Sequence, residues 1–209
     1  MTFAPLVIEH GLLVEVEGVR IHGWAGAALD LDGGTTFGLV TEPTRVALGP
    51  DVFLLREGCY FVAPGPVRIE AGRGLAVLAV GYRGLRQLGG PIEPSGRLRY
   101  IDGCTDTLLV CPPRLGEACL NHLHIPAGTN QTAHTHPSMR VGVIARGSGL
   151  CRTADGDHEL RGGLGWYIPA GLRHSFITRD AALDVLAWHP DSDFGPTDQD
   201  HPMRNRTIL

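Results

Sequence analysis

Two histidines one residue apart, His134 and His136, are the side chains of this sequence best placed to do chemistry. In a strand, alternate side chains project from the same face, so both imidazoles would point to one side with Thr135 opposite. A third histidine, His174, follows a Pro-Ala-Gly turn and begins another apolar stretch. Neutral imidazole is a common ligand of Fe, Ni, Cu, Zn and Mn ions. Each histidine alone would be an ordinary polar residue, but the spaced set predicts a site for one metal ion.

Arg140 stands four residues after His136, where a carboxylate might have completed the site. By strand parity its side chain shares a face with the two histidines, yet a guanidinium stays protonated and cannot ligate a metal. Three outcomes are open. Arg140 binds the anion of a substrate that also coordinates the metal, a bulge turns it outward, or the metal site has been lost. Retention of all three histidines argues against loss and favours a working centre with Arg140 as the anion partner.

Short strands must position these residues. The apolar stretches are about 4–9 residues long, the length of strands, and none of the longer ones keeps the spacing of an amphipathic helix. Turns between them are supplied by 29 glycines and 15 prolines in 209 residues. The pattern predicts an all-β chain, folded as a closed barrel or a jelly-roll sandwich.

An internal repeat divides the chain. Residues 56–68, REGCYFVAPGPVR, align without gaps with residues 161–173, RGGLGWYIPAGLR. Two similar β-units of about 100 residues each are therefore predicted. We place an N-terminal barrel at residues 1–90, a C-terminal barrel at residues 98–190, and an irregular tail at residues 191–209.

Residues 128–178 resemble the two sequence motifs of the cupin superfamily. The first, G-x5-H-x-H-x3–4-E-x6-G, is matched by Gly128, His134, His136 and Gly147, with Arg140 at the Glu position. The second, G-x5-P-x-G-x2-H-x3-N, is matched by Gly163, Pro169, Gly171 and His174, with Thr178 at the Asn position. The resemblance implies a double-stranded β-helix (jelly-roll) barrel that holds a metal inside. With the internal repeat, the whole chain resembles a bicupin made of two cupin-like units.

The N-terminal half lacks the histidines. At the offset of the repeat, Ile69 falls opposite His174, and Leu29 and Leu31 fall opposite His134 and His136. We therefore expect an N-terminal barrel that is apolar inside and free of metal. Structural support or a dimer surface is favoured for it over a second ligand site.

Iron sites with three histidines and no acidic ligand occur among the cupin dioxygenases that act on thiols, β-diketones and hydroxybenzoates. The resemblance thus implies a mononuclear Fe(II)-type dioxygenase for a small anionic metabolite, with His134, His136 and His174 as ligands and Arg140 at the substrate anion. Zn, Ni or Mn are alternative metals. A non-catalytic ligand- or metal-binding module, such as a sensor, and a metal-dependent isomerase or lyase remain alternative functions.

Composition limits the partners. A formal net charge of −4 gives no general affinity for nucleic acid or an anionic membrane. No apolar run is long enough to span a bilayer. Five cysteines without a CxxC pair fit reduced thiols in a cytoplasm. We expect a cytoplasmic homodimer with a small-molecule substrate.

Several other polar residues are expected outside the chemistry. His122 and His124 alternate on a strand whose Leu123 and Ile125 would face the core, so both histidines should lie outside the barrel, although His124 could enter it if that apolar face looks outward. Gln131 and His189 are interpreted as a turn residue and a strand-end residue.

Overall fold

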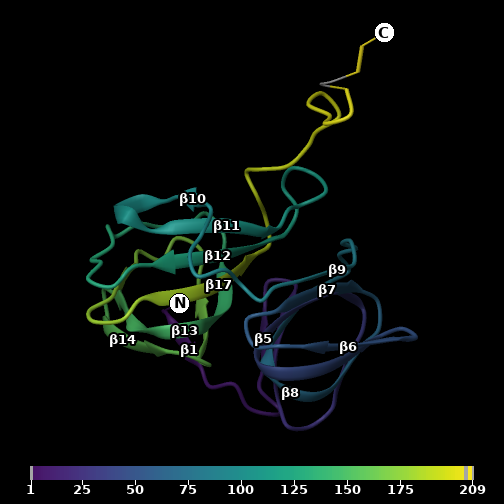
Figure 1. Cartoon of the computed structure of the whole chain (residues 1–209), viewed down its shortest axis with the longest axis horizontal. Helices are drawn as coiled ribbons and strands as arrows, with labels where there is room; N and C mark the ends of the chain where they lie inside the picture. The colour runs from purple at the N-terminus through teal and green to yellow at the C-terminus, as the bar shows by residue number, and fades with distance from the viewer. Residues whose placement is uncertain (1, 205–206, 209) are drawn as a thin grey trace.

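Two antiparallel β-sheets make up nearly all the regular structure of the chain (Figure 1). The computed structural model describes residues 2–204 and 207–208. Within those residues the only helical element is a short 3-10 turn, η1 (Ile101–Gly103). No helix in the described part of the chain is long and apolar enough to cross a membrane. The predicted all-β fold class is therefore confirmed.

The N-terminal sheet has eight strands, in the order β2-β3-β8-β5-β7-β9, with β4 paired to β8 and β6 to β5. Its interior holds apolar side chains such as Trp24, Val40, Phe61 and Ile69. Its strands are β2 (Leu13–Val16), β3 (Val19–Ala25), β4 (Leu29–Leu31), β5 (Gly34–Leu48), β6 (Asp51–Leu55), β7 (Tyr60–Pro64), β8 (Val67–Val80) and β9 (Gln87–Gly89).

The C-terminal sheet has nine strands, in the order β1-β15-β13-β17-β12-β11-β10, with β14 and β16 both paired to β13. Its interior cluster includes Ile144, Trp166, Phe176 and Val185. Its strands are β1 (Ala4–Leu6), β10 (Leu98–Arg99), β11 (Thr105–Val110), β12 (Cys119–Ile125), β13 (Arg140–Thr153), β14 (Gly156–Arg161), β15 (Gly165–Ile168), β16 (Ser175–Ile177) and β17 (Leu183–His189).

A third apolar cluster joins the two units, which lie beside each other in Figure 1. Leu39 and Phe37 of β5 belong to it, as do Val141 of β13 and Trp188 of β17. The rings of Phe37 and Trp188 meet with centroids 5.7 Å apart. Burying apolar surface between the outer faces of both sheets stabilises the two units as one packed body.

The internal repeat reappears in the strand pairing. Leu29 pairs with Ile69 in the N-terminal unit, and His134 forms a β-bridge with His174 in the C-terminal unit. These two pairs are related by the offset found in the sequence. The structure thus places aliphatic and imidazole side chains at matching points of two similar frameworks.

One expected boundary needs correction. Strand β1 lies within residues 1–90, which we assigned to the N-terminal barrel, but it pairs with β15 of the C-terminal sheet. A strand of three residues carries too little pattern to show which sheet edge it will join. The predicted tail, residues 191–209, has no strand among its described members; residues 205–206 and 209 lie outside the described residues.

Candidate metal centre

Three histidine side chains converge inside the C-terminal unit. The candidate ligand atoms of His134, His136 and His174 all lie within 4.8 Å of one another. Their ring centroids are 4.7–5.2 Å apart. The backbones of His134 and His174 exchange two N–H···O bonds of 2.9 Å. The residues that the sequence marked as metal ligands are therefore brought together, although they come from the segments before β13 and β16 instead of from regular strands.

In two of these rings the Nδ1 atom forms a hydrogen bond to a backbone carbonyl oxygen. His134 Nδ1 lies 2.8 Å from the carbonyl oxygen of Thr132, and His174 Nδ1 lies 2.9 Å from that of Leu172. A carbonyl only accepts, so each Nδ1 carries a hydrogen and donates it, which leaves the lone pair on Nε2. Metal-ligating histidines commonly have this arrangement, because the second hydrogen bond fixes the tautomer and the ring orientation. The residues present therefore fit a metal ion.

Burial favours the neutral form of two of the imidazoles. It lowers the pKa of His136 to about 3, helped by the positive charge of Arg140. Burial also lowers the pKa of His174 to about 4, against the opposing hydrogen bond to Leu172. Neutral rings keep the lone pairs that a metal requires.

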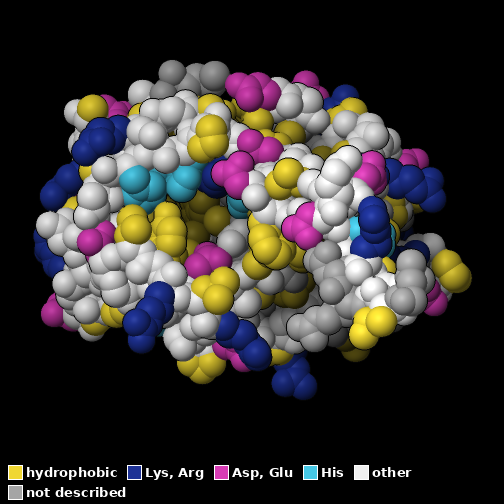
Figure 2. Space-filling view, turned by 90° about the horizontal axis from the view of Figure 1, so that it is seen from above, with side chains coloured by type: hydrophobic (Ala, Val, Ile, Leu, Met, Phe, Trp, Pro, Cys, Tyr) yellow, Lys and Arg dark blue, Asp and Glu magenta, His cyan; other side chains and the backbone are white. Residues whose placement is uncertain are grey.

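A cavity of about 380 Å³ opens beside the three histidines. Figure 2 shows histidine side chains at a hollow of the surface with hydrophobic side chains around it. Much of the wall is apolar: Leu123, Trp166, Ile168, Phe176, Val185 and Ala187. The indole N–H of Trp166 has no hydrogen-bond partner within the described part of the chain. The cavity can therefore surround a small molecule with an apolar body while the polar groups determine its orientation.

Arg140, the first residue of β13, lines the same cavity. Its side chain is 14% exposed, and the nearest carboxylate oxygen, on Asp191, is 3.9 Å away. Burial lowers the pKa of Arg140, and the charge of Asp191 opposes that shift. The structure thus places the guanidinium beside the histidines, as parity predicted, with a carboxylate of the chain's own tail nearby.

His189 is the last residue of β17, as the sequence predicted, and it also lines this cavity. It lines the wall together with Asn121 and Asp106. Burial lowers the pKa of His189 to about 4. Alternation along β17 was the signal that could have found it, because Val185, Ala187 and His189 share one face.

Two other histidines lie outside the cavity as expected, whereas the buried Gln131 joins two segments instead of closing a turn. His122 and His124 point away from the cavity, and each places a ring nitrogen 2.9 Å from the same oxygen of Asp184. The side-chain oxygen of Gln131 accepts the backbone N–H of Phe176 at 3.2 Å.

Comparison with known proteins shows the fold. No family model matches the chain, and no curated protein matches it. Among solved structures, an IolB-like protein from Salmonella typhimurium LT2 is 16% identical, with a TM-score of 0.64 over 98% of this chain and 99% of the other. A cupin 2 conserved barrel domain protein from Leptotrichia buccalis is 11% identical, with a TM-score of 0.62 over 90% and 96%.

A third solved structure is an enzyme. Salicylate 1,2-dioxygenase from Pseudoaminobacter salicylatoxidans, in complex with gentisate, is 12% identical, with a TM-score of 0.60 over 82% of this chain and 68% of the other. At these identities the likeness concerns the fold alone. The chain has the cupin jelly-roll fold that its sequence motifs predicted.

Proposed function

We propose that the protein binds one divalent transition metal through His134, His136 and His174. The observation that carries the proposal is the convergence of three imidazoles, two of which hold their Nδ1–H groups on backbone carbonyls. Imidazole suits Fe, Ni, Cu and Zn ions alike, so the ligand set does not by itself select one metal. Iron is favoured here because of the proposed activity.

The proposed activity is that of an Fe(II)-type dioxygenase acting on a small anionic metabolite. A similarly folded protein is a salicylate 1,2-dioxygenase whose structure contains gentisate, an aromatic carboxylate. When bound, Fe(II) would supply the redox chemistry toward O2 that protein side chains lack. Three neutral ligands would leave the charge of the ion uncompensated and so favour an anionic substrate.

Residues of the chain would supply the binding and the orientation. Arg140 would hold the substrate's anion, since a guanidinium pairs with a carboxylate through two parallel hydrogen bonds. The apolar wall with Trp166 and Phe176 would surround the body of the substrate and exclude water. Fixing the substrate at both places would position its reacting atoms.

The rest of the molecule would serve as a framework. We propose that the chain is a bicupin whose N-terminal unit is metal-free structural support, and that the protein forms homodimers. Sedimentation measurements on the metal-loaded protein would test the dimer, since a sedimenting mass of 22.4 kDa would show a monomer instead.

The activity is tested by metal analysis followed by measurements of O2 consumption. Protein loaded with Fe(II), Zn(II), Ni(II) or Mn(II) is offered gentisate, salicylate, small aliphatic acids and β-diketones. O2 uptake that requires both Fe(II) and one substrate supports the dioxygenase. Tight ligand binding without turnover would instead indicate a sensor, and conversion without O2 an isomerase or lyase.

A further inference from the structure

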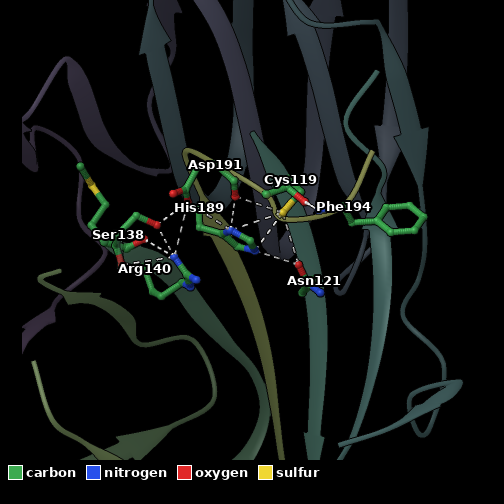
Figure 3. A network of polar contacts seen from close by, with 9 residues as sticks. Cys119, Asn121, Ser138, Arg140, His189, Asp191 and Phe194 are labelled. Atoms are coloured by element: carbon green, nitrogen blue, oxygen red, sulfur yellow. Dashed lines mark hydrogen bonds and ion pairs between the residues drawn. The ribbon is translucent and has the colours of Figure 1, made fainter. Parts of the chain in front are cut away.

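The segment that follows β17 folds back onto the wall of the candidate metal centre. Figure 3 shows Asp191 of this segment beside Ser138, Arg140 and His189. Asp191 lies in the region that the sequence assigned to an irregular tail. Its contacts give that tail a place in the site.

One edge of the Arg140 guanidinium is occupied by the protein. Nη1 donates to Ser138 Oγ at 2.6 Å, to the carbonyl oxygen of Met139 at 3.0 Å and to that of Ser138 at 3.2 Å. Nε and Nη2 make no hydrogen bond to the described residues. These two nitrogens form the side of the guanidinium that can bind both oxygens of one carboxylate.

Ser138 connects this arrangement to Asp191. Its hydroxyl accepts from Arg140 Nη1 and donates its own hydrogen to Asp191 Oδ1. A hydroxyl can do both at once because it has one hydrogen and two lone pairs. The carboxylate thereby orients the hydroxyl that accepts from Nη1, and it also places a negative charge beside the largely buried guanidinium.

The backbone of Asp191 is fastened from the other side. His189 Nδ1 lies 2.5 Å from the carbonyl oxygen of Asp191, and His189 Nε2 lies 2.8 Å from Cys119 Sγ. Because a carbonyl oxygen only accepts, His189 donates from Nδ1, and its Nε2 is left to accept the hydrogen of the Cys119 thiol. Burial raises the pKa of Cys119 to about 12, which agrees with a protonated sulfur. Strand β12 thus holds the start of the tail through one imidazole.

We propose that Asp191 is a positioning residue for substrate binding: through Ser138 it holds Nη1 of Arg140, so that the Nε and Nη2 edge stays available to a substrate carboxylate. This inference deepens the proposed function and rests on it, in that Arg140 binds the substrate's anion. Asp191 itself touches no substrate. The tail is consequently part of the binding site, and its loss disorders the guanidinium without removing a metal ligand.

Crystal structures of variants test the positioning without any ligand. In Asp191→Ala and in Ser138→Ala, the Arg140 guanidinium is expected to leave its place or to adopt several rotamers. Asp191→Asn keeps an acceptor for the hydroxyl and should retain the wild-type position. Asp198→Ala is the matched control, because Asp198 is an acid of the same tail that pairs with Arg114 instead. An unmoved guanidinium in both Asp191→Ala and Ser138→Ala would overturn the inference.

Binding measurements under anaerobic conditions provide the second test. The probes are gentisate and hydroquinone, which is the same ring without the carboxylate. Asp191→Ala is expected to weaken gentisate by about tenfold, roughly the loss of one well-placed hydrogen bond, while hydroquinone binding stays unchanged. A general loosening of the fold would weaken both probes together.

The two proposals fail in different ways. If Arg140→Ala weakens gentisate and Asp191→Ala does not, the positioning role is wrong and the anion site stands. If Arg140→Ala leaves the preference for gentisate over hydroquinone unchanged, the anion site itself is wrong, and the positioning role for substrate falls with it.

Discussion

The two units of this chain place different chemistry on similar frameworks. In the C-terminal unit His134 bridges to His174, and the interior opens into a cavity of about 380 Å³. In the N-terminal unit Leu29 pairs with Ile69; Ile69 belongs to a buried apolar cluster, and the partly buried Leu29 packs against it. The same framework therefore accommodates either a filled apolar interior or a polar site. A few side chains decide which of the two is present.

What the units share is also visible in their packing. Phe61 lies against Gly38 in the N-terminal unit, and Trp166 lies against Gly142 in the C-terminal unit. Phe61 and Trp166 occupy corresponding positions of the repeat. Glycine is required opposite each ring because a side chain there would occupy the space of the aromatic. These contacts therefore stabilise the fold shared by both units and do not depend on the histidine site.

The largest expected difference between the two units is the loss of metal affinity when a candidate histidine ligand is replaced. His174→Ala should lower metal affinity by more than about a hundredfold, since even the outer partners of metal ligands are worth about 10–100-fold. Metal content after dialysis measures this loss. His10→Ala, at an exposed histidine of the N-terminal stretch, is the control and should retain the metal. Metal content as high as that of the wild type in His134→Ala, His136→Ala and His174→Ala would contradict the assignment of these ligands.

The next effect concerns the substrate. Arg140→Ala should leave metal content intact, because a guanidinium donates no lone pair, and should weaken binding of an anionic substrate by about 2–5 kcal/mol. Arg140→Glu should tighten the metal by adding a carboxylate ligand while repelling the substrate. Calorimetry with metal and then with substrate separates these effects. Normal turnover in Arg140→Ala would show that Arg140 does not bind the substrate's anion and that the site consists of the three histidines alone.

Removing a buried side chain should lower the free energy of unfolding more in the N-terminal unit than at the metal site of the C-terminal unit. Ile69 is fully buried, so Ile69→Ala should lower the free energy of unfolding by about 2–5 kcal/mol. His174→Ala in the metal-free protein should cost less, since water from the adjoining cavity can enter the vacated space. Urea denaturation of both variants measures the contrast. A greater loss for His174→Ala would contradict a packed N-terminal interior beside a hollow C-terminal one.

The smallest expected effect tests the shared framework. In Gly142→Ala the added Cβ would lie 1.8 Å from the backbone oxygen of Leu186, and in Gly38→Ala it would lie 2.0 Å from the Phe61 ring. Both substitutions should lower the free energy of unfolding by about 1–3 kcal/mol. Gly162→Ala should change the free energy of unfolding little, because the added Cβ would lie 3.9 Å from the nearest heavy atom, the backbone oxygen of Ala145. Thermal melts of the three variants would reveal whether both units need their glycine.

Local pattern predicted much of this arrangement from the sequence. Short apolar stretches with frequent turns predicted the all-β fold, and parity predicted that Arg140 would share a wall with the histidines. The contact between Cys119 and His189 could not be predicted in the same way, because it joins β12 to β17 and depends on their pairing. Asp191 follows a proline in a polar tail, where no periodicity indicates direction. The site residues that were missed are those positioned by tertiary contacts.

We expect the C-terminal unit to hold one metal ion and the N-terminal unit to hold none. An anomalous-difference map from crystals of the protein incubated with Fe(II) under argon tests both expectations at once. A single peak is expected, at about 2.0–2.2 Å from one ring nitrogen each of His134, His136 and His174. A map with no peak among these rings, or with a peak inside the N-terminal unit, would contradict these expectations.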